Sequence, residues 1–141
     1  MMRVLAIDVG DRRIGLAVSD PLGITAQGLE TYTRAKDDPC ADADYIVAMA
    51  NRYKPVRLLF GMPRNMDGSY GFASDKVNAF AQLVLERWDG EHAFYDERLT
   101  TVTAERVLYE EKLDWQQRRK VVDKLAAVVI LQGYLASNPV L

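Results

Sequence analysis

Residues 3–19 read RVLAIDVGDRRIGLAVS, two apolar runs joined by the short polar segment GDRR. The first run, Arg3–Val9, is nearly unbroken, which is typical of a central strand buried on both faces. Gly10 begins a turn, and Ile14–Ser19 is predicted to pair back on the first strand as a hairpin. Gly15 in the second strand leaves room for another backbone or a ligand to approach.

Beyond the hairpin the chain alternates between strand and helix patterns. The segment 37–42 is predicted to be a polar turn in which Pro39 stops any helix. The remaining expected elements are a strand at Gly28–Thr33, a helix at Asp42–Tyr53, a strand at Val56–Gly61, a helix from Gly71 or Phe72 to Trp88, a strand at His92–Asp96, a helix from Thr100 or Thr101 to about Glu111, and a helix at Arg118–Ala136. This order predicts an α/β fold: a mixed five-stranded sheet of three antiparallel strands followed by parallel crossovers, with helices on its faces. That is the ribonuclease H-like architecture.

Composition limits the classes of protein that fit. The 141 residues fit a single domain spanning residues 1–141. The net charge of -2 argues against a protein that coats nucleic acid through bulk positive charge, although a local basic rim remains compatible with it. Cys40 is the only cysteine, so no intramolecular disulfide can form. The longest apolar stretch, Val121–Leu135, is too short and too polar to span a bilayer, and a cytoplasmic location is expected.

Three carboxylates stand at unusual places in this pattern. Asp8 interrupts the first apolar run, Asp96 and Glu97 stand where a strand gives way to a helix, and Asp123 lies in a helical stretch that is apolar nearly all round. A charged carboxylate in apolar surroundings is costly unless it is paired or binds a metal. Neighbouring side chains of a strand point to opposite faces, so only one member of the Asp96–Glu97 pair can join Asp8. The pattern predicts one shared cation site.

Each carboxylate also has a simpler structural explanation. Asp8 can end its strand, the Asp96–Glu97 pair can be a solvated turn before a helix cap, and Asp123 can pair with a backbone donor or with Arg118 or Arg119. The metal-binding alternative favours Mg²⁺ or Mn²⁺, because both prefer oxygen ligands. A single cysteine and a single histidine provide no ligand set for zinc. Two divalent ions held by clustered carboxylates are typical of nucleases.

Phosphate-binding candidates surround these acids. The turn after the first strand carries Arg12 and Arg13, which together with backbone N–H groups can hold a phosphate. A second basic cluster, residues 118–120, precedes Asp123. The segment 61–69, GMPRNMDGS, is rich in turn residues, and it is either the rim of a substrate groove with Arg64 on a phosphate or simply a long turn.

Five motifs follow one another along the chain: IDVG (7–10), RIGLAVSD (13–20), GMPRNMDGS (61–69), DERLTT (96–101) and DKLAAVVILQGYL (123–135). With these motifs the sequence resembles the YqgF/RuvX family nearly from end to end. The resemblance implies a ribonuclease H-like fold related to RuvC-type resolvases. Members of the family are named either as Holliday junction resolvases or as nucleases that mature the 5′ end of pre-16S rRNA. The resemblance places the acidic metal site on Asp8, Glu97 and Asp123, so it selects Glu97 over Asp96. The family turn often has Thr or Arg where this chain has Asp11.

The predicted function is a metal-dependent nuclease that hydrolyses phosphodiester bonds in structured nucleic acid, with Mg²⁺ or Mn²⁺ as cofactor. An rRNA precursor is the favoured partner, branched DNA is the alternative, and a non-catalytic nucleic-acid-binding module in ribosome assembly or transcription is the second alternative. A nucleotide-phosphate site like that of actin and sugar kinases is disfavoured, because those folds close two lobes over ATP. Monomer and homodimer both remain open. The expected substrate-binding residues are Arg12, Arg13, Arg64, Arg98, Arg119 and Lys120.

Overall fold

The computed structural model describes residues 2–63, 71–96 and 115–137, with the side chains of the last range described from residue 123 onward. Five strands form one sheet, as predicted. The strands are β1 (Arg3–Val9), β2 (Arg13–Ser19), β3 (Ala26–Thr33), β4 (Val56–Met62) and β5 (His92–Asp96), in the spatial order β3-β2-β1-β4-β5. Pairing is antiparallel between β1, β2 and β3 and parallel between β1, β4 and β5, which confirms the predicted mixed sheet.

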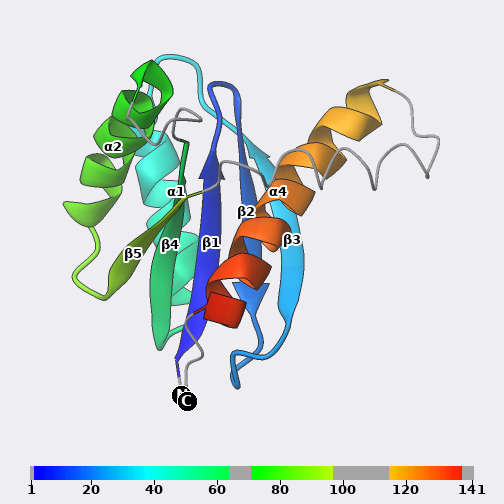
Figure 1. The fold of residues 1–141 in the computed structure, drawn as a ribbon. Coiled ribbons are helices and arrows are strands. Elements are labelled where there is room, and N and C mark those ends of the chain that lie inside the picture. Colours follow the sequence, from blue (N-terminus) through cyan, green and yellow to red (C-terminus); the bar gives the residue numbers. More distant parts are fainter. Residues whose placement is uncertain (1, 64–70, 97–114, 138–141) are drawn as a thin grey trace.

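Helices cover both faces of the sheet (Figure 1). The helices α1 (Pro39–Asn51) and α2 (Phe72–Leu85) lie on one face, and α4 (Trp115–Ser137) lies across the other. Each face has its own hydrophobic cluster. The four predicted inner residues of α2 are all buried: Val77, Phe80, Ala81 and Val84.

Alternation along β1 sorts its side chains between these two faces. Leu5 and Ile7 belong to the cluster under α1 and α2, whereas Val4 and Ala6 belong to the cluster under α4. Asp8 continues the second series, so its side chain is directed to the α4 face. The carboxylate of Asp8 can therefore act only on the side of the sheet that α4 covers.

Two helix starts differ from the sequence-based expectation. Pro39 does not stop a helix; it begins α1, and the side chain of Asp38 caps that helix by accepting a hydrogen bond from the Ala41 amide at 3.0 Å. Proline is well suited to a first helical turn, where its missing N–H has no intrahelical partner. The last helix begins at Trp115, three residues earlier than expected. The predicted helix between Thr100 and Glu111 falls outside the described residues.

Strand β3 begins at Ala26, two residues before the predicted start, and its pairing with β2 carries an irregularity at Leu16 and Ala17.

Within the described ranges no helix has the length and apolar character needed to cross a bilayer.

Candidate functional site: an acidic corner between β1, β2 and α4

Two of the three predicted carboxylates lie on the same side of the sheet at one corner of the fold. Asp8 of β1 stands directly opposite Gly15 of β2, and residues paired in this way project from the same face of the sheet. A Cβ placed on Gly15 would collide with the main-chain carbonyl oxygen of Asp123. Asp8 and Asp123 therefore share the α4 side of the sheet at the end of β1. We call this place, defined by Asp8, Gly15 and Asp123, the acidic corner.

Close approach of α4 makes this corner possible. The predicted role of Gly15, leaving room for another backbone, is confirmed, because the helix backbone occupies the space that a side chain would fill. Ala126 and Ala127, both buried, are the small residues that follow Asp123 on the helix. The absence of a side chain at position 15 thus fixes how far Asp123 stands from the strand that carries Asp8.

Replacing Gly15 by Ala should therefore disturb the corner itself. The new methyl group meets backbone atoms of Asp123, which can give way only if α4 shifts, and overpacking of this kind typically costs about 1–3 kcal/mol. Urea unfolding of Gly15→Ala measures the loss. Gly28→Ala is the matched control, because its Cβ would meet the flexible side chain of Lys124, with Cγ at 2.9 Å. Equal destabilisation by the two variants would contradict the tight packing inferred at Gly15.

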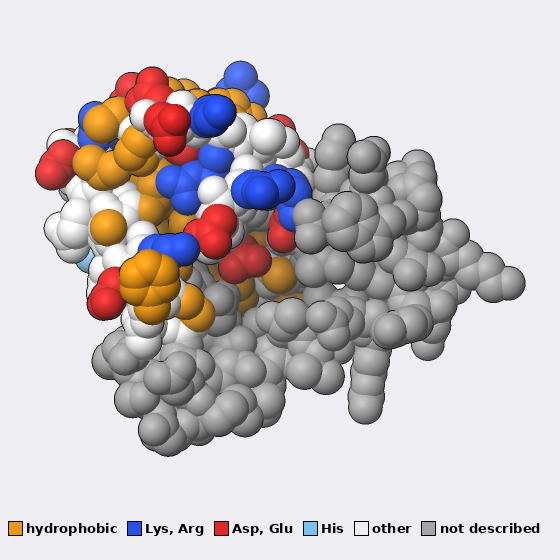
Figure 2. All heavy atoms as spheres, turned by 90° about the horizontal axis from the view of Figure 1, so that it is seen from above, with side chains coloured by type: hydrophobic (Ala, Val, Ile, Leu, Met, Phe, Trp, Pro, Cys, Tyr) orange, Lys and Arg blue, Asp and Glu red, His pale blue; other side chains and the backbone are white. Residues whose placement is uncertain are grey.

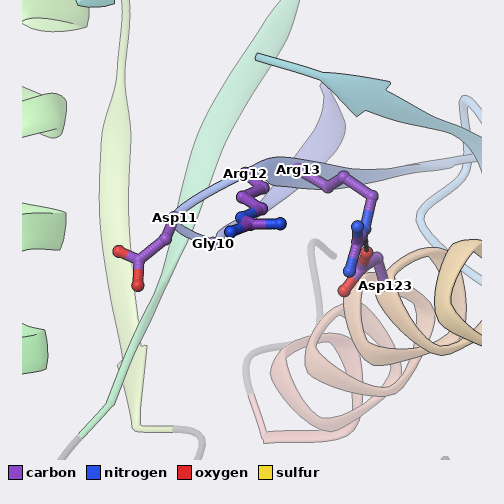
Figure 3. A pocket seen from close by; sticks show the side chains of 5 residues that line it. All are labelled: Gly10, Asp11, Arg12, Arg13 and Asp123. Atoms are coloured by element: carbon purple, nitrogen blue, oxygen red, sulfur yellow. Dashed lines mark hydrogen bonds and ion pairs between the residues drawn. The ribbon is translucent and has the colours of Figure 1, made fainter. Parts of the chain in front are cut away.

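An arginine from β2 pairs with the acid of α4. The Nε of Arg13 donates to Oδ2 of Asp123 at 2.6 Å, and the side chains are 24% and 25% exposed (Figure 3). Asp123 is thus only partly buried. A cationic partner was the simpler explanation for this acid, and the partner that the structure describes, Arg13, lies 110 residues away in sequence. The side chains of Arg118 and Arg119 lie outside the described part of α4. The ion pair makes the Asp123 carboxylate a charged acceptor that already holds one cation.

A cavity of about 430 Å³ opens beside this pair. Its lining residues are Gly10, Asp11, Arg12, Arg13 and Asp123. The Gly10 amide closes the turn by donating to the Arg13 carbonyl at 2.9 Å. Asp11, the residue that departs from the family pattern, is directed away from the Arg13–Asp123 pair (Figure 3), and its Oδ1 accepts from Lys76 Nζ at 3.1 Å. Asp11 still lines the cavity, and its ion pair with Lys76 offsets part of the negative charge that it would present to a phosphate there.

The turn is supported from the opposite face by two residues that sequence reasoning missed. Arg34 donates from Nη1 to the Gly10 carbonyl at 2.9 Å and from Nε to Oδ2 of Asp42 at 2.9 Å. The Asp42 side chain is 1% exposed. A signal was present in the sequence, because Asp42 falls on the same helical stripe as Ile46 and Met49. An acid on an apolar stripe indicates a buried partner.

Of the two neighbouring acids predicted at the end of the fifth strand, the structure describes Asp96 but not Glu97. Asp96 pairs with Met62 across β4 and β5. Phe94, two residues before it, stacks on Phe60 in the core under α1 and α2. Asp96 thus faces away from the acidic corner, which removes it as a rival of Glu97. Glu97 itself lies outside the described residues, and in the part of the chain that is described no three Asp, Glu, His or Cys side chains are gathered to hold a metal ion.

Of the predicted phosphate-binding residues, the structure brings Arg12 and Arg13 together at the cavity. Arg64 and Arg98 lie outside the described residues. Arg119 and Lys120 belong to α4, whose side chains are described only from residue 123. Viewed from above, the described surface carries Lys and Arg interspersed with Asp and Glu rather than a uniform basic face (Figure 2).

The donor chemistry of the corner suits a hard divalent cation. Asp8 and Asp123 offer carboxylate oxygens, and Mg²⁺ is usually held by one or two carboxylates together with phosphate oxygens and waters. The adjoining cavity has room for such a phosphate and is lined by arginines. The residues present therefore fit Mg²⁺ or Mn²⁺.

Comparison with known proteins gives a consistent result. The family RuvX, described as Holliday junction resolvase, matches residues 2–137. A protein of Desulforamulus reducens, named "Putative pre-16S rRNA nuclease", is 47% identical over 137 residues, covering 97% of this chain and 98% of its own length. A protein of Clostridium botulinum with the same name is 46% identical over 136 residues, covering 96% and 98%.

Solved structures resemble this fold at low sequence identity. Thermus thermophilus RuvC in complex with a Holliday junction substrate gives a TM-score of 0.61 at 15% identity, covering 99% of this chain and 98% of the RuvC chain. The Fowlpox virus resolvase with junction DNA gives 0.56 at 13% identity, covering 96% and 98%. These likenesses confirm the predicted ribonuclease H-like fold.

Proposed function

Because the chain belongs to the RuvX family, we propose that it is a nuclease whose acidic corner works with a divalent metal to hydrolyse phosphodiester bonds in structured nucleic acid. The single observation that carries this proposal is the placement of Asp8 and Asp123 on the same side of the sheet, beside a cavity lined by Arg12 and Arg13. A bound divalent ion supplies a lowered pKa for the attacking water and charge stabilisation for the leaving oxygen.

The protein's own residues have distinct roles in this proposal. Asp8 and Asp123 hold the ion through their oxygens, and Glu97 is proposed as the third ligand on the resemblance alone. Arg12 and Arg13 bind phosphate oxygens of the substrate in the cavity, where guanidinium groups can bind in a bidentate manner. The proposed partner is nucleic acid, and the proposed substrate is the 5′ end of pre-16S rRNA, in keeping with the names of relatives that share almost half of the sequence.

Cleavage of a four-way DNA junction is the second candidate, because the matching family is described by that activity. A direct test offers both substrates to the purified chain: a transcript that spans the 5′ boundary of 16S rRNA and a synthetic four-way junction. Each is incubated with Mg²⁺, with Mn²⁺, and with EDTA. We expect the transcript to be cut near the boundary, the cutting to stop in EDTA, and re-added Mg²⁺ to restore it.

Each other result has its own meaning. Metal-dependent cutting of the junction alone would show that the substrate is branched DNA rather than the rRNA precursor. Binding of either nucleic acid with equal affinity in Mg²⁺ and EDTA, and no cleavage of either, would leave a binding module in ribosome assembly or transcription. Cleavage that persists in EDTA would remove the metal from the proposal.

A further inference from the structure

The Arg13–Asp123 ion pair places a cation on one oxygen of a carboxylate that is proposed to bind a metal. Arg13 Nε lies 2.6 Å from Oδ2 of Asp123, which is a short charge-assisted hydrogen bond. Both side chains line the cavity in which the phosphate of a substrate is proposed to bind. Arg13 thus stands between two anionic partners, the carboxylate that it holds in the structure and the phosphate that the cavity would receive.

We propose that Arg13 and a divalent cation compete for Asp123, so that Asp123 releases Arg13 when it binds the ion and the guanidinium becomes available to a substrate phosphate. This inference rests on the proposed function and adds a regulatory exchange to it. Arg13 would neutralise Asp123 whenever no ion is bound, which limits the repulsion between this acid and Asp8. Metal binding and nucleic-acid binding then become coupled through one side chain.

Surrounding charges favour Arg13 for this role among the described side chains. Arg12 lines the same cavity, but it is Arg13 whose guanidinium bonds Asp123. Lys124, the next residue on α4, extends toward Gly28 of β3, with Cγ 2.9 Å from the position of a Cβ there. Lys76 is bonded to Asp11 on the other side of the turn. Arg13 is also partly exposed, so its guanidinium can leave Asp123 without breaking a packed core.

The exchange predicts that metal binding and nucleic-acid binding strengthen each other, and this coupling can be measured. If ion binding frees Arg13 for phosphate, then nucleic acid must raise the affinity for the ion by the same factor by which the ion raises the affinity for nucleic acid. Removing Arg13 eliminates the competitor and the coupling together. We therefore expect Arg13→Gln to bind Mn²⁺ about tenfold or more tightly than the wild type, the factor that loss of a charged hydrogen bond represents.

Mn²⁺ titration followed by electron paramagnetic resonance of the free ion measures this affinity without any cleavage assay. Arg12→Gln is the matched control, because it removes one positive charge from the same turn and leaves the competitor in place; we expect a change of no more than about threefold from its more distant charge. Circular dichroism checks folding. Arg13→Lys is the second variant should Arg13→Gln fail to fold, and it is expected to give a smaller gain than the Gln variant.

The outcomes separate the two proposals. If the wild type binds Mn²⁺ and Arg13→Gln binds it equally or more weakly, Arg13 orients Asp123 rather than competing for it, and the exchange is overturned while the metal site stands. An equal gain in Mn²⁺ affinity in Arg12→Gln would show that any loss of positive charge near the site has this effect, and it would also overturn the exchange. If the wild type binds no Mn²⁺, the metal site of the proposed function fails, and the exchange falls with it. A tenfold gain confined to Arg13→Gln supports it.

Discussion

Replacing Asp8 by Asn is expected to lower metal-dependent cleavage at least about a hundredfold, since loss even of an outer partner of a metal ligand typically costs 10–100-fold. Asn keeps the size of Asp but loses the negative charge that a divalent ion requires. The fold should survive, because Asp8 is half-buried at the end of β1 rather than in the core.

Asp96→Asn is the control for this experiment. Asp96 also ends a strand of the parallel part of the sheet, but it stands on the α1/α2 face. Its cleavage rate should stay close to that of the wild type. The measurement is the single-turnover rate at saturating Mg²⁺ for both variants, with thermal melting as a check of folding. Undiminished cleavage by Asp8→Asn would rule out the proposed mechanism.

The largest effect on stability is expected at Asp42. Asp42→Asn should lower the free energy of unfolding at pH 7 by about 3 kcal/mol, the lower end of the cost of breaking a buried ion pair, because Arg34 retains some contact with water. Three donors bond the Asp42 carboxylate: the Ala35 amide at 2.8 Å, Arg34 Nε at 2.9 Å and the Tyr32 hydroxyl at 3.0 Å. An Asn amide cannot accept from all of them.

The loss should depend on pH with a definite sign. Burial by itself raises the pKa of Asp42, but the hydrogen bonds from the Ala35 amide, Arg34 and Tyr32 outweigh it and hold the pKa below its ordinary value. A carboxyl whose pKa is lowered by folding stabilises the protein above its unfolded pKa, about 3.9, and that stabilisation is lost as the pH falls through the folded value. The difference between wild type and Asp42→Asn should therefore be full at pH 7 and shrink in acid below about pH 4.

Urea unfolding at pH 7, 5 and 3 measures this difference. Asp44→Asn serves as the control, since Asp44 lies on the same helix, is 69% exposed and pairs with Arg87 at 2.7 Å. A surface pair of this kind is worth about 0–1 kcal/mol, so the control should change little. A deficit in Asp42→Asn that stayed constant down to pH 3 would contradict the charged role of Asp42.

Apolar runs bounded by turn residues were sufficient to predict the sheet. In β1 and β2 the apolar runs are long and end in turn residues, so their bounds follow from sequence almost to the residue. The first residues of helices were harder to predict, because a proline can either stop a helix or begin one. Only the capping bond of Asp38 distinguishes the two cases at Pro39. Such bonds depend on the path of the chain before the helix, which periodicity does not reveal.

The sequence predicted that Asp8 and Asp123 would lie close together, but it did not predict the partner of Asp123. Asp8 and Asp123 stood out because a carboxylate is rare in such apolar surroundings, and they do share one corner. The partner of Asp123 could not be predicted, since helical spacing points only to nearby arginines and the pair to Arg13 exists through tertiary packing. The face of the sheet to which Asp96 points could not be predicted either. Ala93, Phe94 and Tyr95 are all apolar, so β5 shows no alternation of polar and apolar residues from which the face could be inferred.

The two hydrophobic clusters on opposite faces of the sheet also have a practical consequence. Most of the large buried side chains lie under α1 and α2, while the acidic corner depends on how α4 rests on β1 and β2. Protein engineers seeking a heat-resistant version can therefore repack a residue such as Val84 with less risk to the acidic corner than residues beneath α4. Substitutions beneath α4 are instead expected to move Asp123 relative to Asp8 and so to lower cleavage.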